Sequence, residues 1–378
     1  MRLIFVAHAF PRWPGDVAGS FLGRLGTALV ARGHAVSAVV PADRGQADRR
    51  VHGGVDVVPV RYAAPARENL AYTGTMARAM RSPANAWAFR NMVHAMRRAA
   101  RAEADHRQAD LLHAFWWVPA GWAIAPLALP RIVSLMGTDV AMLRSWAGRW
   151  LGHRVLGRVS HVTSISTYLA DEVRRQLGRP DMPITRVPMP VATERFTRRS
   201  QGGGGIVYLG RLSAQKRVTL LLDAIHATGL TAPVTIVGDG PARRDLEQHA
   251  RALGLTQVRF TGTVPDDALH ATIGDADVMA FPSEREGLGL AAAEALMMGV
   301  PVVATTDGGG VLDLVQDGKG AAIVTPDPTA FGSALARCLG DSTMRAGAVV
   351  AGDGLRAALA PESIAKAFER VYEEVTRG

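Results

Sequence analysis

Residues 282–295, Pro-Ser-Glu-Arg-Glu-Gly-Leu-Gly-Leu-Ala-Ala-Ala-Glu-Ala, join an apolar run to an Ala- and Leu-rich run. Residues 277–281 predict a buried strand, whereas residues 290–298 favour a helix. Gly287 and Gly289 therefore lie in a strand-to-helix loop, where bare backbone can approach a ligand closely. The predicted helix start offers free N–H groups and a partial positive charge, which suit a diphosphate.

Two carboxylates frame this loop. Glu286 precedes the predicted helix, and Glu294 lies about one turn inside it. A carboxylate can accept hydrogen bonds from a pair of neighbouring sugar hydroxyls. The pattern therefore predicts a phosphate cradle flanked by two hydroxyl acceptors. The alternative interpretation is a generic loop–helix unit of an α/β sheet.

The same stretch resembles the Glu-x7-Glu signature of retaining glycosyltransferases of family 4, which have the GT-B fold. Glu286 and Glu294 occupy the positions of its two carboxylates. Residues 210–217, Gly-Arg-Leu-Ser-Ala-Gln-Lys-Arg, resemble the family's Gly-Arg-Leu-x-x-x-Lys segment. The resemblance implies that Arg211 and Lys216 stabilise the charge that grows on a leaving diphosphate.

The resemblance also implies roles for other residues. Glu294 would bind the ribose of the donor and Glu286 the transferred sugar. His113 matches a histidine at a strand end of the family, although Phe115 replaces the family's second histidine; the alternative is a buried strand histidine. The full expected set is Arg211, Lys216, Glu286 and His113 for catalysis, Gly19, Gly210, Gly238, Val264, Glu286, Gly287, Leu288, Gly289, Leu290 and Glu294 for the donor, and Gly15, Trp116 and Asp139 for the acceptor.

Strands and helices alternate on both sides of residue 200, which predicts an α/β fold with two parallel sheets. The resemblance implies the GT-B form of this architecture, with two Rossmann-like, doubly wound domains facing a cleft. We expect an acceptor-binding domain at residues 1–199 and a glycine-rich linker at residues 200–205. A nucleotide-sugar donor domain follows at residues 206–360, and a helix at residues 361–378 crosses back to the first domain.

Charge is unevenly distributed along the chain. Residues 1–200 contain 28 Arg and no Lys against 13 acidic residues, a formal charge of +15, whereas residues 201–378 carry −6. All seven tryptophans lie in the first part. This composition predicts contact with something anionic or amphiphilic, such as a membrane surface met by the basic helical stretch at residues 76–107. The alternatives are arginines that only solvate a core-facing helix, or a nucleic-acid partner.

The chain has the character of an enzyme of the cytoplasm. Its single cysteine, Cys338, excludes a disulfide framework within the chain, and no apolar run is long enough to span a bilayer. The first residues have the pattern of a strand and not that of a signal peptide. We expect a cytoplasmic location, with membrane association as an additional feature, and a monomer or a homodimer.

The function expected from the resemblance is a hexosyltransferase that moves a sugar, with retention, from a nucleotide-diphosphate sugar to an acceptor hydroxyl. A UDP-sugar is favoured, and GDP- and ADP-sugars are alternatives. The acceptor is open: a glycan, a lipid-linked or small molecule, or a modified nucleic acid. No cofactor or metal is expected, and Asp275 and Asp277 are interpreted as a helix-to-strand turn. The rival functions are a phosphorylase, a sugar-nucleotide epimerase, or a basic nucleic-acid-binding protein without transferase activity.

Overall fold

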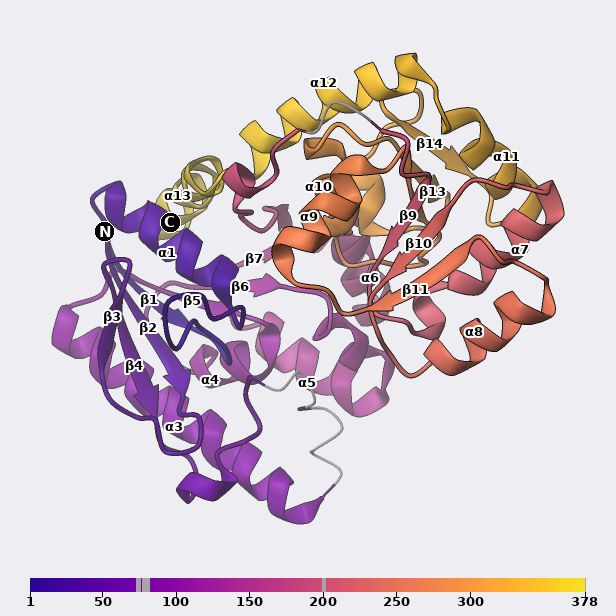
Figure 1. Cartoon of the computed structure of the whole chain (residues 1–378). Coiled ribbons are helices and arrows are strands. Elements are labelled where there is room, and N and C mark those ends of the chain that lie inside the picture. Colours follow the sequence, from indigo (N-terminus) through magenta and orange to yellow (C-terminus); the bar gives the residue numbers. More distant parts are fainter. Residues whose placement is uncertain (73–75, 77–81, 199–201, 378) are drawn as a thin grey trace. The chain divides into compact units, whose positions relative to one another are not determined.

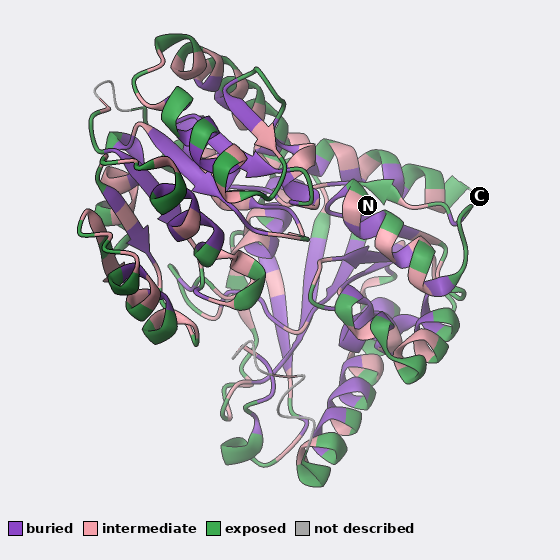
Figure 2. Ribbon diagram, turned by 90° about the vertical axis from the view of Figure 1, so that its right-hand side faces the viewer, coloured by how far each residue is buried: buried purple, intermediate pink, exposed green. Residues whose placement is uncertain are grey.

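The computed structural model describes residues 1–72, 76, 82–198 and 202–377. The chain divides into two compact units (Figure 1). The first comprises Met1–Val191 together with Leu359–Gly378, and the second comprises Ala192–Ala358. Each unit has its own sheet with helices around it, and the strands of both sheets are mostly buried (Figure 2). Among the described residues, no helix is both long and apolar enough to cross a membrane.

The sheet of the first unit has eight strands in the order β3-β4-β2-β1-β5-β6-β7-β8. All neighbouring strands are parallel except β3, which pairs antiparallel with β4. The order reverses at β1, so the loops after β1 and β5 flank a topological switch point. The strands are β1 (Arg2–Val6), β2 (Ala35–Pro41), β3 (Arg50–His52), β4 (Val55–Val60), β5 (Leu111–Phe115), β6 (Arg131–Leu135), β7 (His161–Ser164) and β8 (Thr185–Arg186).

Helices cover both faces of this sheet, which explains why its central strands are apolar along their whole length. On one face, α1 (Ser20–Ala31) and α13 (Pro361–Arg377) pack with the strands in one apolar core. On the other face lies α3 (Pro83–Arg107), which contacts β1, β2 and β4 (Figure 1). The remaining short helices are η1 (Pro65–Arg67), η2 (Trp117–Gly121), α4 (Trp122–Ile124), η3 (Val140–Arg144), α5 (Trp146–Leu156) and α6 (Thr167–Leu177).

The sheet of the second unit has six parallel strands in the order β11-β10-β9-β12-β13-β14. Its order reverses between β9 and β12. The strands are β9 (Ile206–Leu209), β10 (Val234–Val237), β11 (Val258–Gly262), β12 (Val278–Phe281), β13 (Val302–Thr305) and β14 (Ala321–Val324). The helices are η4 (Thr193–Arg195), η5 (Ala214–Lys216), α7 (Val218–Thr228), α8 (Arg243–Ala252), α9 (Asp266–Asp275), α10 (Leu290–Met297), η6 (Gly310–Asp313), α11 (Pro328–Cys338) and α12 (Ser342–Leu359).

The border between the units differs from the expected one at residue 200. Residues 192–198 belong to the second unit, because polar contacts attach them to it. Arg195 forms an ion pair with Asp266 at 2.6 Å, and Arg356 donates to the carbonyl oxygen of Thr193 at 2.8 Å. The glycine-rich run therefore lies inside the second unit, and its residues 200 and 201 lie outside the described residues.

Candidate functional site

Two loops at the carboxyl edge of the second sheet form the centre of the candidate site. They follow β9 and β12, neighbouring strands on either side of the switch point, where open α/β sheets bind ligands. Nζ of Lys216, in the loop after β9, donates to Oε1 of Glu286, in the loop after β12, at 2.5 Å. The ion pair thus fastens the two loops together, and its side chains are 22% and 12% exposed.

A second cation, Arg211, lies on the same loop as Lys216. Arg211 is exposed, and its guanidinium forms no ion pair with any residue that the structure describes. The next residue, Leu212, is buried and anchors the loop. Two of the residues predicted for phosphate charge, Arg211 and Lys216, are therefore presented from one loop, with one of the two charges uncompensated.

A second glycine loop supports the Glu286 loop from behind. The backbone N–H groups of Arg285 and Glu286 donate to the carbonyl oxygens of Asp307 and Gly308, both at 2.9 Å. Gly309 has a φ of +74°, and a Cβ there would lie 2.8 Å from backbone atoms of Glu286. Only glycine fits this approach. The position of Glu286 therefore depends on a loop that follows β13.

Arg217 is a functional residue to which the sequence analysis gave no role. Its guanidinium donates to Asp307 at 2.7 and 2.9 Å and to Oγ1 of Thr305 at 3.0 Å. Its Nε donates to the carbonyl oxygen of Pro282 at 2.9 Å. One side chain thus connects both loops that hold Glu286. The basic pair Lys216-Arg217 was visible in the sequence, but nothing there distinguished a ligand-facing cation from a supporting one.

Glu294 lies on α10, one turn into the helix that begins after Gly289. Burial raises the pKa of Glu294 to about 7, and the nearby charges of Arg195 and Asp266 act in opposite directions. The carboxyl group therefore changes charge close to neutral pH. The charge of Asp266, the first residue of α9, acts on this carboxyl group, so Glu294 lies near the start of that helix.

Two of the predicted donor glycines are required by the close packing of the backbone itself. At Gly238 (φ +129°), a Cβ would lie 2.0 Å from the carbonyl oxygen of Gly210, because the turns after β9 and β10 touch each other. At Gly289 (φ +82°), a Cβ would lie 2.7 Å from Cβ of Val311. At both Gly238 and Gly289, another part of the same unit therefore lies so close that a larger side chain would clash with it.

The other predicted donor residues differ in what they can offer. Leu288 is buried, so the part of it that can reach a ligand is its backbone. Gly287, Leu290 and Val264 are half-buried. Val264 lies in the loop between β11 and α9, at the same edge of the sheet. Asp277, in the turn before β12, accepts from the backbone N–H groups of Gly203 at 2.8 Å and Gly205 at 3.0 Å.

His113 is a core residue, which corrects its predicted catalytic role. It is fully buried on β5, where Nδ1 lies 2.9 Å from the hydroxyl of Tyr372 and Nε2 lies 2.7 Å from Oγ of Ser134. Burial lowers the pKa of His113 to about 3, so its imidazole is neutral. With both nitrogens bonded and no exposed surface, it cannot contact a substrate. The alternative of a buried strand histidine is the correct one.

Asp139 also has a structural role instead of the predicted acceptor contact. It is buried, and its carboxylate accepts from the backbone N–H groups of Trp117 at 3.0 Å, Met136 at 3.1 Å and Gly137 at 2.9 Å. It therefore holds the loops after β5 and β6 together. Trp116 is half-buried beside it, with a φ of +69°, and remains an accessible candidate.

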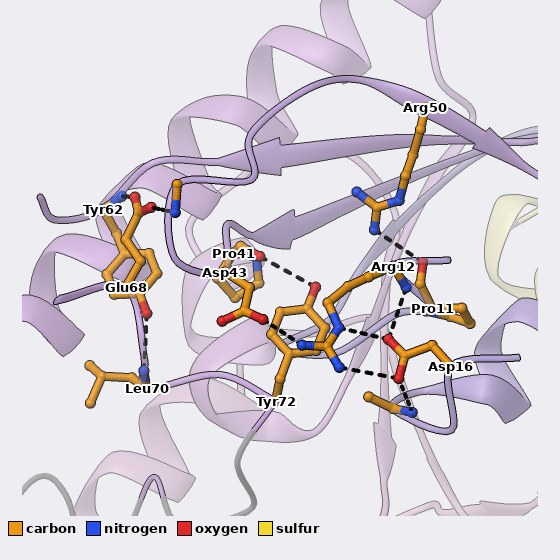
Figure 3. A network of polar contacts seen from close by, with 12 residues as sticks. Pro11, Arg12, Asp16, Pro41, Asp43, Arg50, Tyr62, Glu68, Leu70 and Tyr72 are labelled. Atoms are coloured by element: carbon orange, nitrogen blue, oxygen red, sulfur yellow. Dashed lines mark hydrogen bonds and ion pairs between the residues drawn. The ribbon is translucent and has the colours of Figure 1, made fainter. Parts of the chain in front are cut away.

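The loop after β1 is held by a network around Arg12 (Figure 3). The guanidinium of Arg12 donates to both oxygens of Asp16, at 2.7 and 3.2 Å, and to Asp43 after β2. It also lies 4.2 Å from the ring centre of Trp13 and 4.7 Å from that of Tyr72. Although burial opposes ionisation, hydrogen bonds from Arg12 lower the pKa of Asp16 to about 2. Arg12 thus connects the loop after β1 with Asp43, which follows β2.

Two predicted glycines lie in this loop. Gly19 begins α1 with a φ of +67°, and a Cβ there would lie 2.6 Å from the carbonyl oxygen of Ala9, so the loop folds back on itself at this point. Gly15 has a φ of +86°, and no described atom lies within 4 Å of the place of its Cβ. Gly15 therefore remains open to a ligand, whereas Gly19 shapes the loop.

His8 is a candidate that the sequence analysis missed. It follows β1 at the switch point of the first sheet, and its ring centre lies 4.0 Å from that of Trp116. Burial lowers the pKa of His8 to about 4, and its buried Nδ1 has no hydrogen-bond partner among the described residues. No sequence pattern marks His8, because His8 and Trp116 become neighbours only through the pairing of β1 with β5.

Models of two protein families match the chain. The one described as "Glycosyl transferase 4-like domain" matches residues 18–190, and the one described as "Glycosyl transferases group 1" matches residues 203–341. Glycogen synthase from Mycobacterium tuberculosis is 28% identical over 405 aligned positions, which cover 100% of this chain and 96% of the relative. The GDP-mannose-dependent alpha-(1-6)-phosphatidylinositol monomannoside mannosyltransferase from Mycolicibacterium smegmatis is 32% identical over 265 positions, covering 61% of this chain and 69% of the relative.

Other curated relatives match over less of their length. A teichuronic acid biosynthesis glycosyltransferase from Bacillus subtilis is 28% identical over 219 positions, and the chain spans 54% of that relative. Among solved structures, sucrose-phosphate synthase from Thermosynechococcus elongatus has a TM-score of 0.79 at 19% identity, covering 100% of this chain and 99% of that one. Anabaena HepE in complex with UDP and glucose has a TM-score of 0.67 at 17% identity, covering 99% and 100%. These likenesses show the same two-domain fold.

Proposed function

Because the chain belongs to the group 1 glycosyltransferases, with the GT-B fold, we propose that it is a retaining, metal-independent enzyme. It moves a hexosyl group from a nucleotide-diphosphate sugar to a hydroxyl group of an acceptor. The observation that carries the proposal is the joined pair of Lys216 and Glu286, with Arg211 on the same loop and the start of α10 directly behind.

The positive charges of this edge suit a leaving diphosphate. Arg211 can bind two phosphate oxygens with its fork of N–H groups, and Lys216 adds a point charge. Charge on the diphosphate grows as the bond to the sugar breaks, so fixed cations stabilise the transition state more than the ground state. The two side chains would thereby supply the charge that a metal ion supplies in other sites.

The reaction balances without a protein base. The bond between the anomeric carbon and the leaving phosphate oxygen breaks, and a bond from the acceptor oxygen forms on the same face of the sugar. The proton of the acceptor hydroxyl passes to the departing phosphate oxygen. In this scheme Glu286 holds hydroxyls of the transferred sugar, and Glu294 accepts hydrogen bonds from the ribose.

We favour a UDP-sugar as the donor, with GDP- and ADP-sugars as alternatives. The likeness to HepE, whose structure contains UDP and glucose, supports the first choice. The likeness to a GDP-mannose-dependent mannosyltransferase keeps the second one open. The half-buried Val264, in the loop after β11, is the residue that we assign to the nucleotide base.

Calorimetric titration with UDP, GDP and ADP tests the donor site. One nucleotide should bind, Glu294→Ala should weaken it by about tenfold to a hundredfold, and Glu284→Ala, on an outer part of the same loop, should not. If no nucleotide binds, or if both variants behave like the wild type, the proposed donor site is wrong.

A second measurement tests the reaction class. The donor is a sugar conjugate of the nucleotide that binds, and it is offered together with a panel of acceptors. NMR should show a product that keeps the anomeric configuration of the donor. The product should form equally well when a metal chelator is present. Dependence on added phosphate would instead indicate a phosphorylase. Conversion of the sugar nucleotide without any acceptor would indicate an epimerase.

A further inference from the structure

Helix α5 carries two tryptophans on its outward side. Trp146 is 77% exposed and Trp150 is 56% exposed, and their spacing of four residues places them on one side of the helix. The opposite side is already packed, because Gly152, Val155 and Leu156 are buried. The two indole rings therefore do not contribute to the packing of α5 against its unit. Their exposure favours a role in binding.

The helix presents these rings from a fixed base. Ser145 caps its start, with Oγ accepting from the backbone N–H of Gly148 at 3.0 Å. Further along, the helix lies so close to η3 that a Cβ on Gly152 would come within 2.5 Å of Cδ2 of Leu143. Because the helix is fixed by its cap and its inner side, the rings can meet a partner without a change of fold.

The surroundings of the two tryptophans are basic. Between Asp139 and Asp171 the chain has no acidic residue and four arginines, Arg144, Arg149, Arg154 and Arg158. The guanidinium of Arg154 lies 4.8 Å from the ring centre of Trp150, so a cation and an aromatic ring stand side by side. Arg144 interacts with Glu172 of α6, and Arg149 donates to the carbonyl oxygen of Arg144 at 3.0 Å. Arg154 and Arg158 are exposed.

The long helix α3 lacks this combination, although its sequence suggested a membrane contact at residues 76–107. Its apolar side is packed against the core through Phe89, Met92 and Met96, which are buried. Its one exposed tryptophan, Trp87, is 64% exposed and has no aromatic neighbour one turn away on the helix. The core-facing interpretation thus holds for α3, and residues 77–81 lie outside the described residues.

We infer that the outward side of α5, together with Arg158 just beyond its end, docks on a membrane surface that contains anionic phospholipids. We call this surface the α5 face (Trp146, Trp150, Arg154 and Arg158), and all four of its residues are exposed. Tryptophan prefers the interfacial layer of a bilayer, where its ring is apolar and its N–H remains hydrated. Arginines beside it are attracted by anionic headgroups. A neutral glycan would match the tryptophans but would leave the excess of positive charge without a partner.

Vesicle binding by the whole protein tests this inference, and it does not require any knowledge of the enzyme's substrates. The probes are vesicles of phosphatidylcholine alone and of phosphatidylcholine mixed with phosphatidylglycerol, followed by co-sedimentation and by tryptophan fluorescence. The protein should bind the mixed vesicles, with a blue shift, and bind the neutral ones at least tenfold more weakly. Binding should weaken as salt is raised.

Matched variants locate the contact. Trp146→Ser/Trp150→Ser should reduce partitioning at least tenfold, and Arg154→Glu/Arg158→Glu should reduce it at least twenty-fold, since each basic residue near an anionic surface contributes about fivefold. Trp87→Ser and Arg98→Glu, exposed substitutions of the same kinds on α3, are the controls and should bind like the wild type. Circular dichroism should show all of these variants folded.

Three results would overturn the inference. The first is no binding to mixed vesicles, and the second is full binding by both α5 double variants. The third is a loss of binding in the α3 controls equal to that in the α5 variants. If the α5 variants lose affinity for a single-stranded oligonucleotide while vesicles are not bound at all, the face is a nucleic-acid surface and the membrane assignment is wrong.

Discussion

Nδ1 of His113 lies 2.9 Å from the hydroxyl oxygen of Tyr372, although 259 residues separate them in the chain. The other ring nitrogen lies 2.7 Å from Oγ of Ser134. All three groups are buried, so each relies on the others for hydrogen bonding. The contact attaches α13 to the middle strand of the first sheet and explains why a histidine is accommodated in an apolar core.

Tyr372→Phe should destabilise the first unit without changing turnover. The substitution leaves a buried imidazole nitrogen without a partner, which costs about 1–3 kcal/mol of unfolding free energy. Urea unfolding followed by tryptophan fluorescence reports on this unit alone, because all seven tryptophans lie within it. Arg377→Ala, an exposed change in the same helix, is the control. An unchanged midpoint would contradict this account of His113.

Lys216→Met should lower kcat/KM by about a hundredfold to a thousandfold, the usual effect of removing one preorganised charge from a transition state. Lys216→Arg should restore part of this loss, because the charge returns with a different shape. Steady-state kinetics with the cognate donor is the measurement. A rise in KM with unchanged kcat would show that Lys216 binds the ground state and the transition state equally strongly, which would contradict this role.

Nucleotide affinity should depend on the protonation of Glu294. Only the carboxylate accepts hydrogen bonds from both ribose hydroxyls, and burial raises the pKa of Glu294 to about 7. Affinity should therefore fall by up to about tenfold for each pH unit below 7. Titrations with a sugar nucleotide, whose diphosphate diester does not titrate near neutrality, measure this. Glu294→Gln should bind weakly at every pH, and a sloping profile in that variant would exclude Glu294 as the cause.

The same shift predicts a stability cost in the second unit. A carboxyl group whose pKa is higher in the folded state than in the unfolded state favours folding only while it is protonated. Stability should therefore decline as the pH rises from the ordinary value of 4.5 to about 7, by about 3 kcal/mol in total. Glu294→Gln should recover that amount above pH 7, measured by hydrogen exchange in α10. Equal exchange in both proteins would contradict the prediction.

His8→Asn should lower kcat by about tenfold to a hundredfold while leaving the unfolding transition nearly unchanged. His8 carries a buried nitrogen without a partner beside the half-buried Trp116, and such a group needs an explanation. We expect a substrate atom to complete its hydrogen bonding. Ser160→Ala, on the unit's surface, is the control. If kcat is unchanged and only stability falls, His8 is a packing residue.

The sequence made the periodic parts of the fold predictable. Apolar runs at β1, β5 and β12 are short and continuous because both faces of each strand are buried, and this pattern is local. Strand β3 was not predicted from the sequence. It is an edge strand within a charged segment, and only its pairing with β4 makes it a strand.

Less of the candidate site than of the fold could be predicted from the sequence. The motif residues Lys216 and Glu286 are in contact because the loops after the neighbouring parallel strands β9 and β12 leave the sheet at the same edge. Motif matching could not show that Gly238 faces another backbone or that His113 is enclosed by Tyr372. Those facts depend on contacts between segments that are far apart in the sequence, and a sequence motif does not reveal such contacts.

The first unit is completed by residues that follow the second unit in the chain. Ile364, Phe368 and Tyr372 of α13 lie in the apolar core that also contains Leu3 and Phe5 of β1. During synthesis from the N-terminus, the second unit has all of its residues before the first unit has its last helix. The first unit therefore lacks part of its apolar core until α13 has been synthesised. A stop codon anywhere before α13 would thus damage the half of the protein that was made first.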